Sequence, residues 1–263
     1  MRITLTVLQQ QAKSNEKFTV LTCYDATFAK VLEDAGIDVL LVGDSLGNVV
    51  KGDSTTLTVT LDEIIYHTQC VSNSVQKALI MADLPFGSYQ QSPQQAFANA
   101  SKIIAAGAHM VKLEGGRIMA ETISFLTQRG IPVCAHIGLM PQSIHQLGGY
   151  KLQGNSQQSA AILLEDAKLL EKSGAGALLM EVVPAKLAGE ITQSLSIPTI
   201  GIGAGKNCSA QVLVLHDMLG LCQGKKPRFV KNFMEGANSI QEAVTNYVQA
   251  VKSGQFPDHE HEY

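Results

Sequence analysis

Residues 38–50 read DVLLVGDSLGNVV, and the way in which this stretch changes character indicates the fold. A continuous apolar run stops at Gly43 and is followed at once by Asp44 and Ser45. Apolar runs without alternation are typical of strands buried on both faces of a parallel sheet. A buried carboxylate is costly without a partner, so the same ending elsewhere in the chain would indicate a shared polar site.

Eight short apolar runs of this kind occur along the chain, separated by amphipathic stretches. They span residues 18–25, 38–45, 78–85, 109–116, 132–138, 177–184, 198–205 and 211–219. Strands that alternate with helices in this way predict an α/β fold, and eight such units predict a (β/α)8 TIM barrel. The alternative is an open doubly wound sheet, but the first strand–helix turn lacks the G-x-G-x-x-G spacing of dinucleotide-binding folds.

Capping signals open the helices that connect these strands. Thr60-Leu-Asp-Glu63 reads as a capping box for a helix that continues to about residue 75. Ser92 followed by Pro93 opens a helix that continues to about residue 106. A third helix is predicted over residues 156–173, because a glycine follows it directly.

The chain reads as a single barrel domain over residues 1–263, without linkers or low-complexity segments. A content of 45% apolar residues is enough for one large core. The weakest unit is the last crossover, because Gly205 and Gln211 are too close for a full helix between them. A further helix from about residue 234 to 252 is predicted to pack outside the barrel.

Composition excludes several classes of protein. The net charge is −3 and the basic residues are scattered, so no nucleic-acid partner is expected. No apolar stretch is long enough to span a membrane, and no secretory signal is apparent at the N-terminus. Five cysteines without a C-x-x-C pair predict reduced thiols and a cytoplasmic location. The acidic, histidine-containing last residues, PDHEHEY, could bind a metal, but a frayed terminus is the prediction.

Strand after strand ends on a polar residue. The six residues are Asp25, Asp44, Asp83, Glu114, His136 and Glu181. In a (β/α)8 barrel the carboxyl ends of all strands face one mouth, so these side chains are expected to converge there. Converging carboxylates repel one another unless a cation or a substrate lies among them. The hard oxygen donors of Asp44, Asp83 and Glu114 suit Mg²⁺ or a similar cation.

Each of these residues also has a structural reading. Asp44 and Asp83 could cap the following segments, and Glu114 could be a salt-bridge partner. Lys112 and Glu114 are two residues apart and point to the same side of their strand. Lys112 is therefore either neutralised by the carboxylates or available to bind an anionic substrate group, and the nearby acids argue against a Schiff base.

Two further strand-end residues are candidates for proton transfer or substrate contact. His136 is either a satisfied packing residue or part of the site. Glu181 lies away from the three acidic residues in sequence, so it is the candidate for a carboxylate that is free to act as a general base. The other four histidines that precede the tail are expected to be structural or at the surface, and they are His67, His109, His145 and His216.

Several motifs occur in order along the chain: GDSLGNVV, TLDEIIYHT, ADLPFGSY, VKLEGG, AHIGLMPQS, GGYKLQG and the segment from MEVVP to GIGAG. Taken together they resemble the ketopantoate hydroxymethyltransferase family, and the resemblance runs from about residue 3 to 255. It implies a barrel of the phosphoenolpyruvate/pyruvate superfamily. It also implies transfer of a hydroxymethyl group from 5,10-methylenetetrahydrofolate to 3-methyl-2-oxobutanoate through a metal-stabilised enolate. The product is 2-dehydropantoate, in the first committed step of pantothenate biosynthesis.

The resemblance also implies roles for particular residues and a setting for the enzyme. Asp44 and Asp83 match magnesium ligands, with Glu114 beside the metal, and Glu181 matches the proton acceptor. The residues that surround the oxo acid are Asp44, Ser45, Asp83, Lys112 and His136. Family members are cytoplasmic and usually form homo-oligomeric rings, often decamers.

The chain departs from the family pattern at three places. Ala82 replaces a usual glycine, Met140 a usual threonine, and residues 206–211 read KNCSAQ where a proline followed by Asp-Gly-Gln is usual. None of these changes removes a site residue. Two alternatives to the implied activity stay open, a carbon–carbon lyase or mutase acting on a related 2-oxo acid and a catalytically silent barrel that serves in binding or assembly.

Overall fold

Within residues 2–221, 224 and 226–263, which the computed structural model describes, eight parallel strands form a closed barrel. They follow one another around the sheet in chain order, and β8 pairs with β1 to close it. The strands are β1 Phe18–Thr22, β2 Val39–Val42, β3 Leu79–Asp83, β4 Met110–Glu114, β5 Val133–Gly138, β6 Ala177–Glu181, β7 Thr199–Ile202 and β8 Ala210–Leu213. Every predicted apolar run overlaps one strand, so the predicted (β/α)8 fold is confirmed.

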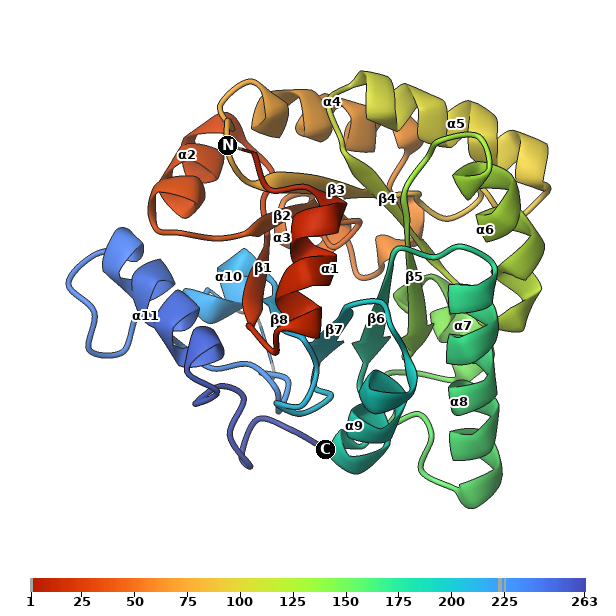
Figure 1. The fold of residues 1–263 in the computed structure, drawn as a ribbon. Coiled ribbons are helices and arrows are strands. Elements are labelled where there is room, and N and C mark those ends of the chain that lie inside the picture. The colour runs from red at the N-terminus through yellow and green to blue at the C-terminus, as the bar shows by residue number, and fades with distance from the viewer. Residues whose placement is uncertain (1, 222–223, 225) are drawn as a thin grey trace.

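The helices surround this barrel, with the strands at the centre of the view in Figure 1. The α-helices are α1 Leu5–Lys13, α2 Ala26–Asp34, α3 Leu46–Val49, α4 Leu61–Ser72, α5 Pro93–Ala105, α6 Ala120–Thr127, α7 Ile144–Leu147, α8 Gln157–Lys172, α9 Ala185–Ser194, α10 Leu215–Met218 and α11 Ile240–Lys252. Three short 3-10 turns are η1 Thr56–Thr58, η2 Arg117–Met119 and η3 Pro141–Ser143.

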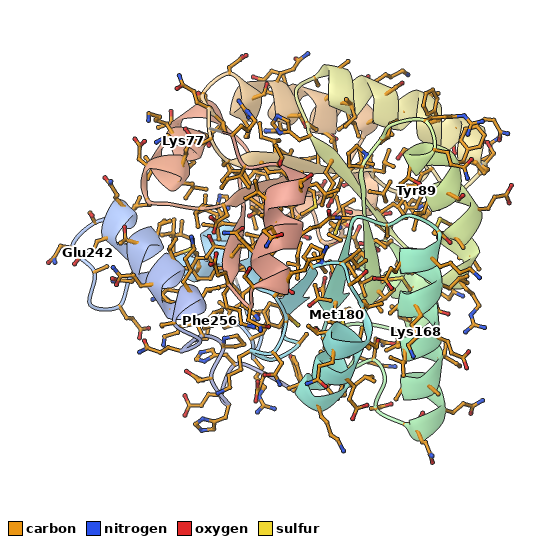
Figure 2. All side chains as sticks on the ribbon, viewed as in Figure 1. Lys77, Tyr89, Lys168, Met180, Glu242 and Phe256 are labelled. Carbon is orange, nitrogen blue, oxygen red and sulfur yellow. The ribbon has the colours of Figure 1, made fainter. Side chains whose placement is uncertain are left out.

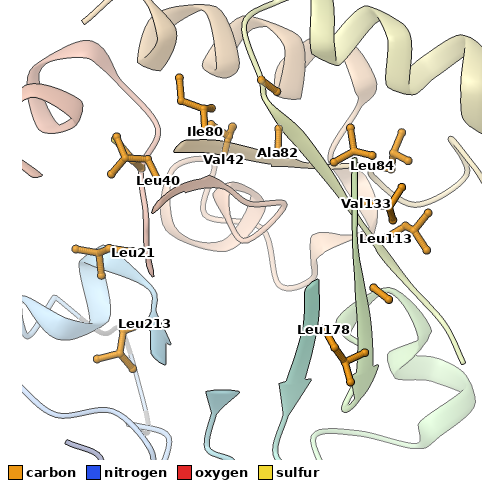
Figure 3. Packing of buried hydrophobic residues seen from close by; sticks show 14 of the residues in the cluster. Leu21, Leu40, Val42, Ile80, Ala82, Leu84, Leu113, Val133, Leu178 and Leu213 are labelled. Carbon is orange, nitrogen blue, oxygen red and sulfur yellow. The ribbon is translucent and has the colours of Figure 1, made fainter. Parts of the chain in front are cut away.

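The strands bury both faces, as their continuous apolar runs predict. Leu40 and Ile80 face outward and pack beneath the helices, in the layer drawn in Figure 3. Val39 and Met81, one position away, face inward and fill the barrel itself. Burial of one such side chain contributes on the order of 2 kcal/mol. Side chains alternate along a strand. A polar residue two positions after an inward-facing apolar residue of the same strand therefore also faces inward.

The predicted caps are present. The Thr60 hydroxyl accepts a hydrogen bond from the Glu63 amide, and the Glu63 carboxylate accepts one from the Thr60 amide, which completes the capping box of α4. Ser92 caps α5 in the same position, with Pro93 in its first turn. These caps satisfy amide groups that the first turn of a helix leaves unpaired.

Helix α1 covers the amino-terminal end of the barrel. Its Leu8 is buried with the apolar side chains that fill the barrel interior. The preceding Arg2 donates hydrogen bonds to the carbonyls of Val75 and Ala78, just before β3. Because this end is closed, access to the barrel interior is from the carboxyl ends of the strands.

The carboxyl-terminal part of the barrel deviates most from a regular repeat. The connection from β7 to β8 is a short turn segment without a helix, as the spacing predicts. Helix α11 begins at Ile240, with Ser239 as its N-cap, rather than at about residue 234. The hydroxyl of Tyr247 on α11 lies within hydrogen-bond distance of the carbonyls of Val20 and Gln211, which fastens the helix to β1 and β8.

The tail after α11 is folded back onto the barrel, so the prediction of a frayed terminus is wrong. Phe256, labelled near the end of α11 in Figure 2, is buried. The guanidinium of Arg228 donates hydrogen bonds to the carbonyls of His259 and Glu260. The Tyr263 carbonyl accepts a hydrogen bond of 2.8 Å from the Ala185 amide at the start of α9. Composition alone could not reveal these contacts, because most of them are made by backbone groups.

In the part of the chain that the structure describes, no helix is both long and apolar enough to cross a membrane. Four cysteines there are free thiols, as predicted. The fifth, Cys222, lies outside the described residues.

Candidate active site

The barrel interior changes from apolar to polar at its carboxyl end. Met81 faces inward, so Asp83, two positions later, also faces inward, and the same alternation directs Lys112 and Glu114 inward after Met110. By this rule His136 faces inward, because it lies two positions after the inward-facing Cys134. Glu181 faces inward as well, two positions after the inward-facing Leu179. A layer of charged side chains therefore lies directly above the apolar filling of the barrel.

These side chains line one cavity of about 770 Å³ at the mouth of the barrel. All seven predicted site residues contribute to its wall, and they are Asp44, Ser45, Asp83, Lys112, Glu114, His136 and Glu181. Asp25 does not join them, which corrects the prediction for that residue. Its carboxylate accepts a hydrogen bond from the Phe28 amide and caps α2 at the exposed surface.

Lys112 is a buried cation among buried carboxylates. Its Nζ atom lies 3.1 Å from Asp83 Oδ1 and 3.4 Å from His136 Nδ1. Burial disfavours the ammonium group, but Asp83, Glu114 and Asp44 outweigh that effect and raise the pKa of Lys112 well above its usual range. A lysine held in its charged form is suited to bind an anion and unsuited to form a Schiff base.

Asp44 and Asp83 are joined through the backbone. The Asp44 amide donates a hydrogen bond of 2.9 Å to Asp83 Oδ2, so the end of β2 is fixed to the end of β3. Burial raises the pKa of Asp44 to about 8, and repulsion by Asp83 and Glu114 adds to the effect. Burial also raises the pKa of Asp83, although Lys112 opposes it. Both carboxylates therefore favour a cation close by.

Glu114, His136 and Glu181 form a chain across the mouth. His136 Nδ1 lies 3.4 Å from Glu114 Oε1, and His136 Nε2 lies 3.4 Å from Glu181 Oε2. Burial and Lys112 oppose a positive charge on His136, but the two carboxylates raise its pKa to about 9. Burial alone would raise the pKa of Glu114, whereas its contacts with His136 and Lys112 lower it overall. The side chain of Glu181 is 15% exposed, against 2% for Glu114.

Ser45 follows β2, directly after Asp44, and lines the cavity. Its hydroxyl is 2.8 Å from the hydroxyl of Tyr24, which comes from the loop after β1. Tyr24 in turn accepts a hydrogen bond at its carbonyl from the His67 ring, a contact of 2.6 Å. His67 is thus structural, as predicted, and Ser45 presents an oriented hydroxyl to the cavity.

The acidic residues fit a hard divalent cation, although one of the three predicted ligands, Glu114, has another partner. Mg²⁺ usually takes one or two carboxylates from the protein and completes its shell with water and substrate oxygens. Asp44 and Asp83, both with a raised pKa, are suited to this role. Over the described residues, no three His, Cys, Asp or Glu side chains are grouped closely enough to hold a metal. Glu114 is already engaged by His136, so its role as a third ligand stays a prediction.

Several lining residues were missed at the sequence level. His216, expected to be structural or at the surface, lines the cavity together with Asp217 at the start of α10. Both follow β8, so the strand-end rule applied to that strand also points to them. Tyr150, in the segment GGYKLQG, lines the cavity as well. Gln142 and Tyr89 lie behind the carboxylates, and only the folded loops bring them there.

The unusual loop at residues 206–210 lies outside the cavity wall as far as the chain is described. Its backbone is held from the amino end of β1, where Lys17 Nζ donates hydrogen bonds to the carbonyls of Lys206 and Cys208. The departure from the family pattern in this loop therefore leaves the site residues in place.

Comparisons with known proteins agree with the geometry. The sequence model of the family described as "Ketopantoate hydroxymethyltransferase" matches residues 2–259. The chain is 64% identical to a 3-methyl-2-oxobutanoate hydroxymethyltransferase of Nitrosospira multiformis, over the whole length of both. It is 66% identical to a protein of the same name from Nitrosomonas eutropha, over 99% of this chain and 97% of the relative.

Solved structures resemble this chain in fold. A phosphonopyruvate hydrolase crystallised with oxalate and Mg²⁺ has a TM-score of 0.62 at 13% identity and covers 80% of each chain. A 2,3-dimethylmalate lyase has a TM-score of 0.59 at 19% identity and covers 81% of each chain. At these identities the likeness concerns the barrel alone.

Proposed function

Because the chain belongs to the ketopantoate hydroxymethyltransferase family, we propose that it transfers a hydroxymethyl group to 3-methyl-2-oxobutanoate and gives 2-dehydropantoate. The donor in this proposal is 5,10-methylenetetrahydrofolate, and the reaction is the first committed step of pantothenate biosynthesis. The observation that supports it best is one cavity in which Asp44, Asp83, Lys112 and Glu181 meet. This set provides carboxylates for a cation, a fixed positive charge for an acid and a separate base.

The oxo acid presents hydrogen-bond acceptors, and the groups that hold it are hydrogen-bond donors. Its carboxylate and keto oxygens are acceptors, and the charged Lys112 and the Ser45 hydroxyl can both donate to them. Lys112 is suited to this task because its surroundings keep it protonated. Met81 and the other apolar side chains below this layer close the barrel, which leaves the oxo acid above the strand ends.

Asp44 and Asp83 would hold the divalent cation, with Glu114 beside it. When bound, Mg²⁺ polarises the keto group of the 2-oxo acid and makes its C3 proton more acidic. The repulsion between Asp44 and Asp83, which raises the pKa of Asp44, is relieved by such a positive charge.

Glu181 is the proposed base. It is more exposed to the cavity than Glu114, and it lies at the far end of the chain of contacts through His136. Glu181 accepts the C3 proton of the oxo acid, and C3 then forms a bond to the methylene carbon of the folate. Both bonds of that carbon to folate nitrogens break: one opens as the bond to C3 forms, and water replaces the other and supplies the hydroxyl group of the product. The two freed nitrogens take up the proton held by Glu181 and one proton from water. His136, held between two carboxylates, keeps Glu181 in orientation.

Exchange of the C3 proton with solvent tests the assignment of Glu181. We predict that Glu181→Gln lowers the rate of deuterium incorporation at C3 by about 10²–10⁴-fold, the usual contribution of a general base. Binding of the oxo acid, measured by calorimetry, should stay within a few-fold of the wild type. Glu165→Gln, at the exposed surface of α8, serves as the matched control. Undiminished exchange in Glu181→Gln would remove Glu181 from this role.

Turnover with and without methylenetetrahydrofolate, over a series of Mg²⁺, Mn²⁺ and Co²⁺, tests the activity as a whole. Turnover without the folate would favour a lyase or mutase acting on the oxo acid. We further propose a cytoplasmic homo-oligomer, a decamer by resemblance. A monomer in sedimentation velocity would contradict the oligomer.

A further inference from the structure

We infer that Gln142 is a positioning residue that holds the Asp44 carboxylate in its orientation toward a bound cation and the 2-oxo acid. This inference rests on the proposed function, because it assigns a purpose to the orientation of Asp44. Gln142 lies in η3, in the loop after β5, and it is buried.

The direction of the Gln142 amide follows from its neighbours. Its Nε2 atom donates a hydrogen bond of 2.8 Å to Asp44 Oδ2 and one of 3.0 Å to the carbonyl of Leu84. The Leu84 carbonyl can only accept a hydrogen bond, so the Gln142 atom beside it must be the nitrogen. The nitrogen must therefore face Asp44, and both of its hydrogens are used.

The opposite side of the amide is held in a complementary way. Gln142 Oε1 lies 2.7 Å from the hydroxyl of Tyr89. That hydroxyl accepts a hydrogen bond of 3.0 Å from the Glu114 amide. Its own proton has two acceptors in reach, and Gln142 Oε1 at 2.7 Å is nearer than the Glu114 carbonyl at 3.2 Å. Gln90 Nε2 approaches the same oxygen at 3.3 Å. A rotation of the Gln142 amide would place donor against donor and acceptor against acceptor.

Gln142 thereby connects the ends of three strands. Its side chain contacts Asp44 after β2 and Leu84 after β3, and its backbone amide donates a hydrogen bond of 3.0 Å to Glu114 Oε2 at the end of β4. Among the described residues, no hydrogen bond reaches the other Asp44 oxygen, Oδ1. Gln142 thus fixes one oxygen of Asp44 and leaves the other for a ligand in the cavity.

Groups of this kind that orient a metal ligand typically change metal affinity by about 10–100-fold when they are removed. The test is the dissociation constant of Mn²⁺, measured by electron paramagnetic resonance on the otherwise unaltered full chain. We expect Gln142→Met, which keeps the volume and removes the amide, to bind Mn²⁺ at least about 10-fold more weakly than the wild type. The KM for the oxo acid should rise, while the KM for the folate stays within about twofold.

Gln211→Met is the matched control. Gln211 is also a buried glutamine of this barrel, and it donates a hydrogen bond to the Gly205 carbonyl, away from the carboxylates. We expect this variant to lose thermal stability without a change in Mn²⁺ affinity beyond about twofold. Equal losses of affinity in both variants would show a general effect of destabilisation and would overturn the inference.

If Gln142→Met does not fold, a second variant tests whether Gln142 positions Asp44. Tyr89→Phe removes the hydroxyl that orients the Gln142 amide and leaves Asp44 untouched, and we expect Mn²⁺ affinity to fall by about threefold to tenfold. Wild-type affinity in Tyr89→Phe, or in folded Gln142→Met, would contradict the role of Gln142. A wild-type protein that binds neither Mn²⁺ nor the oxo acid would instead contradict the proposed function.

Discussion

Lys112 carries a positive charge in a place from which water is nearly excluded, and its neighbours explain how. Its side chain is 5% exposed, and Asp83 Oδ1 lies 3.1 Å from its Nζ atom. An unpaired buried charge would be strongly destabilising. The carboxylates around Lys112 therefore stabilise its charge, and Lys112 in turn reduces the repulsion among them.

Replacement of Lys112 should separate binding of the acid from binding of the cation. We predict that Lys112→Gln weakens binding of 3-methyl-2-oxobutanoate by about 10–100-fold, because a desolvated charged partner is lost. Mn²⁺ affinity at pH 8.5 should not fall, since a positive charge that competes for Asp83 is removed. Calorimetry with each ligand measures both effects, and Lys102→Gln, on the exposed face of α5, is the control. A parallel loss of metal affinity would show that Lys112 mainly maintains the architecture of the site.

At the scale of single residues, the period-two alternation of strands makes much of the site predictable. Lys112 and Glu114 point the same way because they are two positions apart in one strand, and the apolar runs identify where each strand ends. Asp25 shows the limit of this reasoning. It follows a strand as Asp44 does, but the helix that begins directly after it uses its carboxylate as a cap. Gln142 could not be predicted, because its partners depend on how three separate loops fold over the barrel.

At the scale of elements, the helix boundaries that were predicted best are those at which the sequence contains a capping residue. Helices α4 and α5 begin where Thr60 and Ser92 predict, because a side-chain cap satisfies backbone amides at one defined position. The start of α11 was predicted too early. The segment before it, MEGANS, contains Gly236 in a left-handed backbone conformation, and the cap that fixes the start is Ser239.

Glu33, at the end of α2, connects two elements through its charge. Its carboxylate accepts hydrogen bonds from the amides of Gln76 and Ala78, in the segment that leads into β3. Burial would raise the pKa of Glu33, but these backbone donors outweigh it and lower the pKa. The contact therefore depends on the ionised form and should respond to pH.

We predict that Glu33→Gln lowers the free energy of unfolding by about 1 kcal/mol at pH 7, a charge-assisted hydrogen bond discounted for partial exposure. A carboxylate with a lowered pKa in the folded state stabilises fully above its unfolded pKa of about 4.3 and loses its effect as pH falls through the folded value. In urea unfolding, the difference between variant and wild type should therefore be smaller at pH 3 than at pH 7. Asp34→Asn, which alters only the exposed Lys30 pair, should change stability by less than about 0.5 kcal/mol.

At the scale of the whole molecule, the two chain ends lie at opposite ends of the barrel. Helix α1 covers the amino ends of the strands, whereas the tail packs near the mouth. Tyr263 belongs to an apolar cluster with Leu139, Val182 and Phe229. Phe229 lines the cavity, and Val182 directly follows Glu181. The tail thus supports two parts of the cavity wall that are far apart in sequence.

Removal of the residues after Pro257 should therefore affect the site without altering its charged layer. We predict a fall in turnover of about tenfold, because the segments that carry Phe229 and Glu181 lose their support. Mn²⁺ affinity should stay within about twofold, since Asp44 and Asp83 do not contact the tail. Glu260→Ala is the control, because Arg228 binds the backbone carbonyl of Glu260 rather than its exposed side chain. Steady-state kinetics and Mn²⁺ titration of both proteins measure these effects, and full turnover in the shortened chain would mean that the barrel alone holds Glu181 and Phe229 in place.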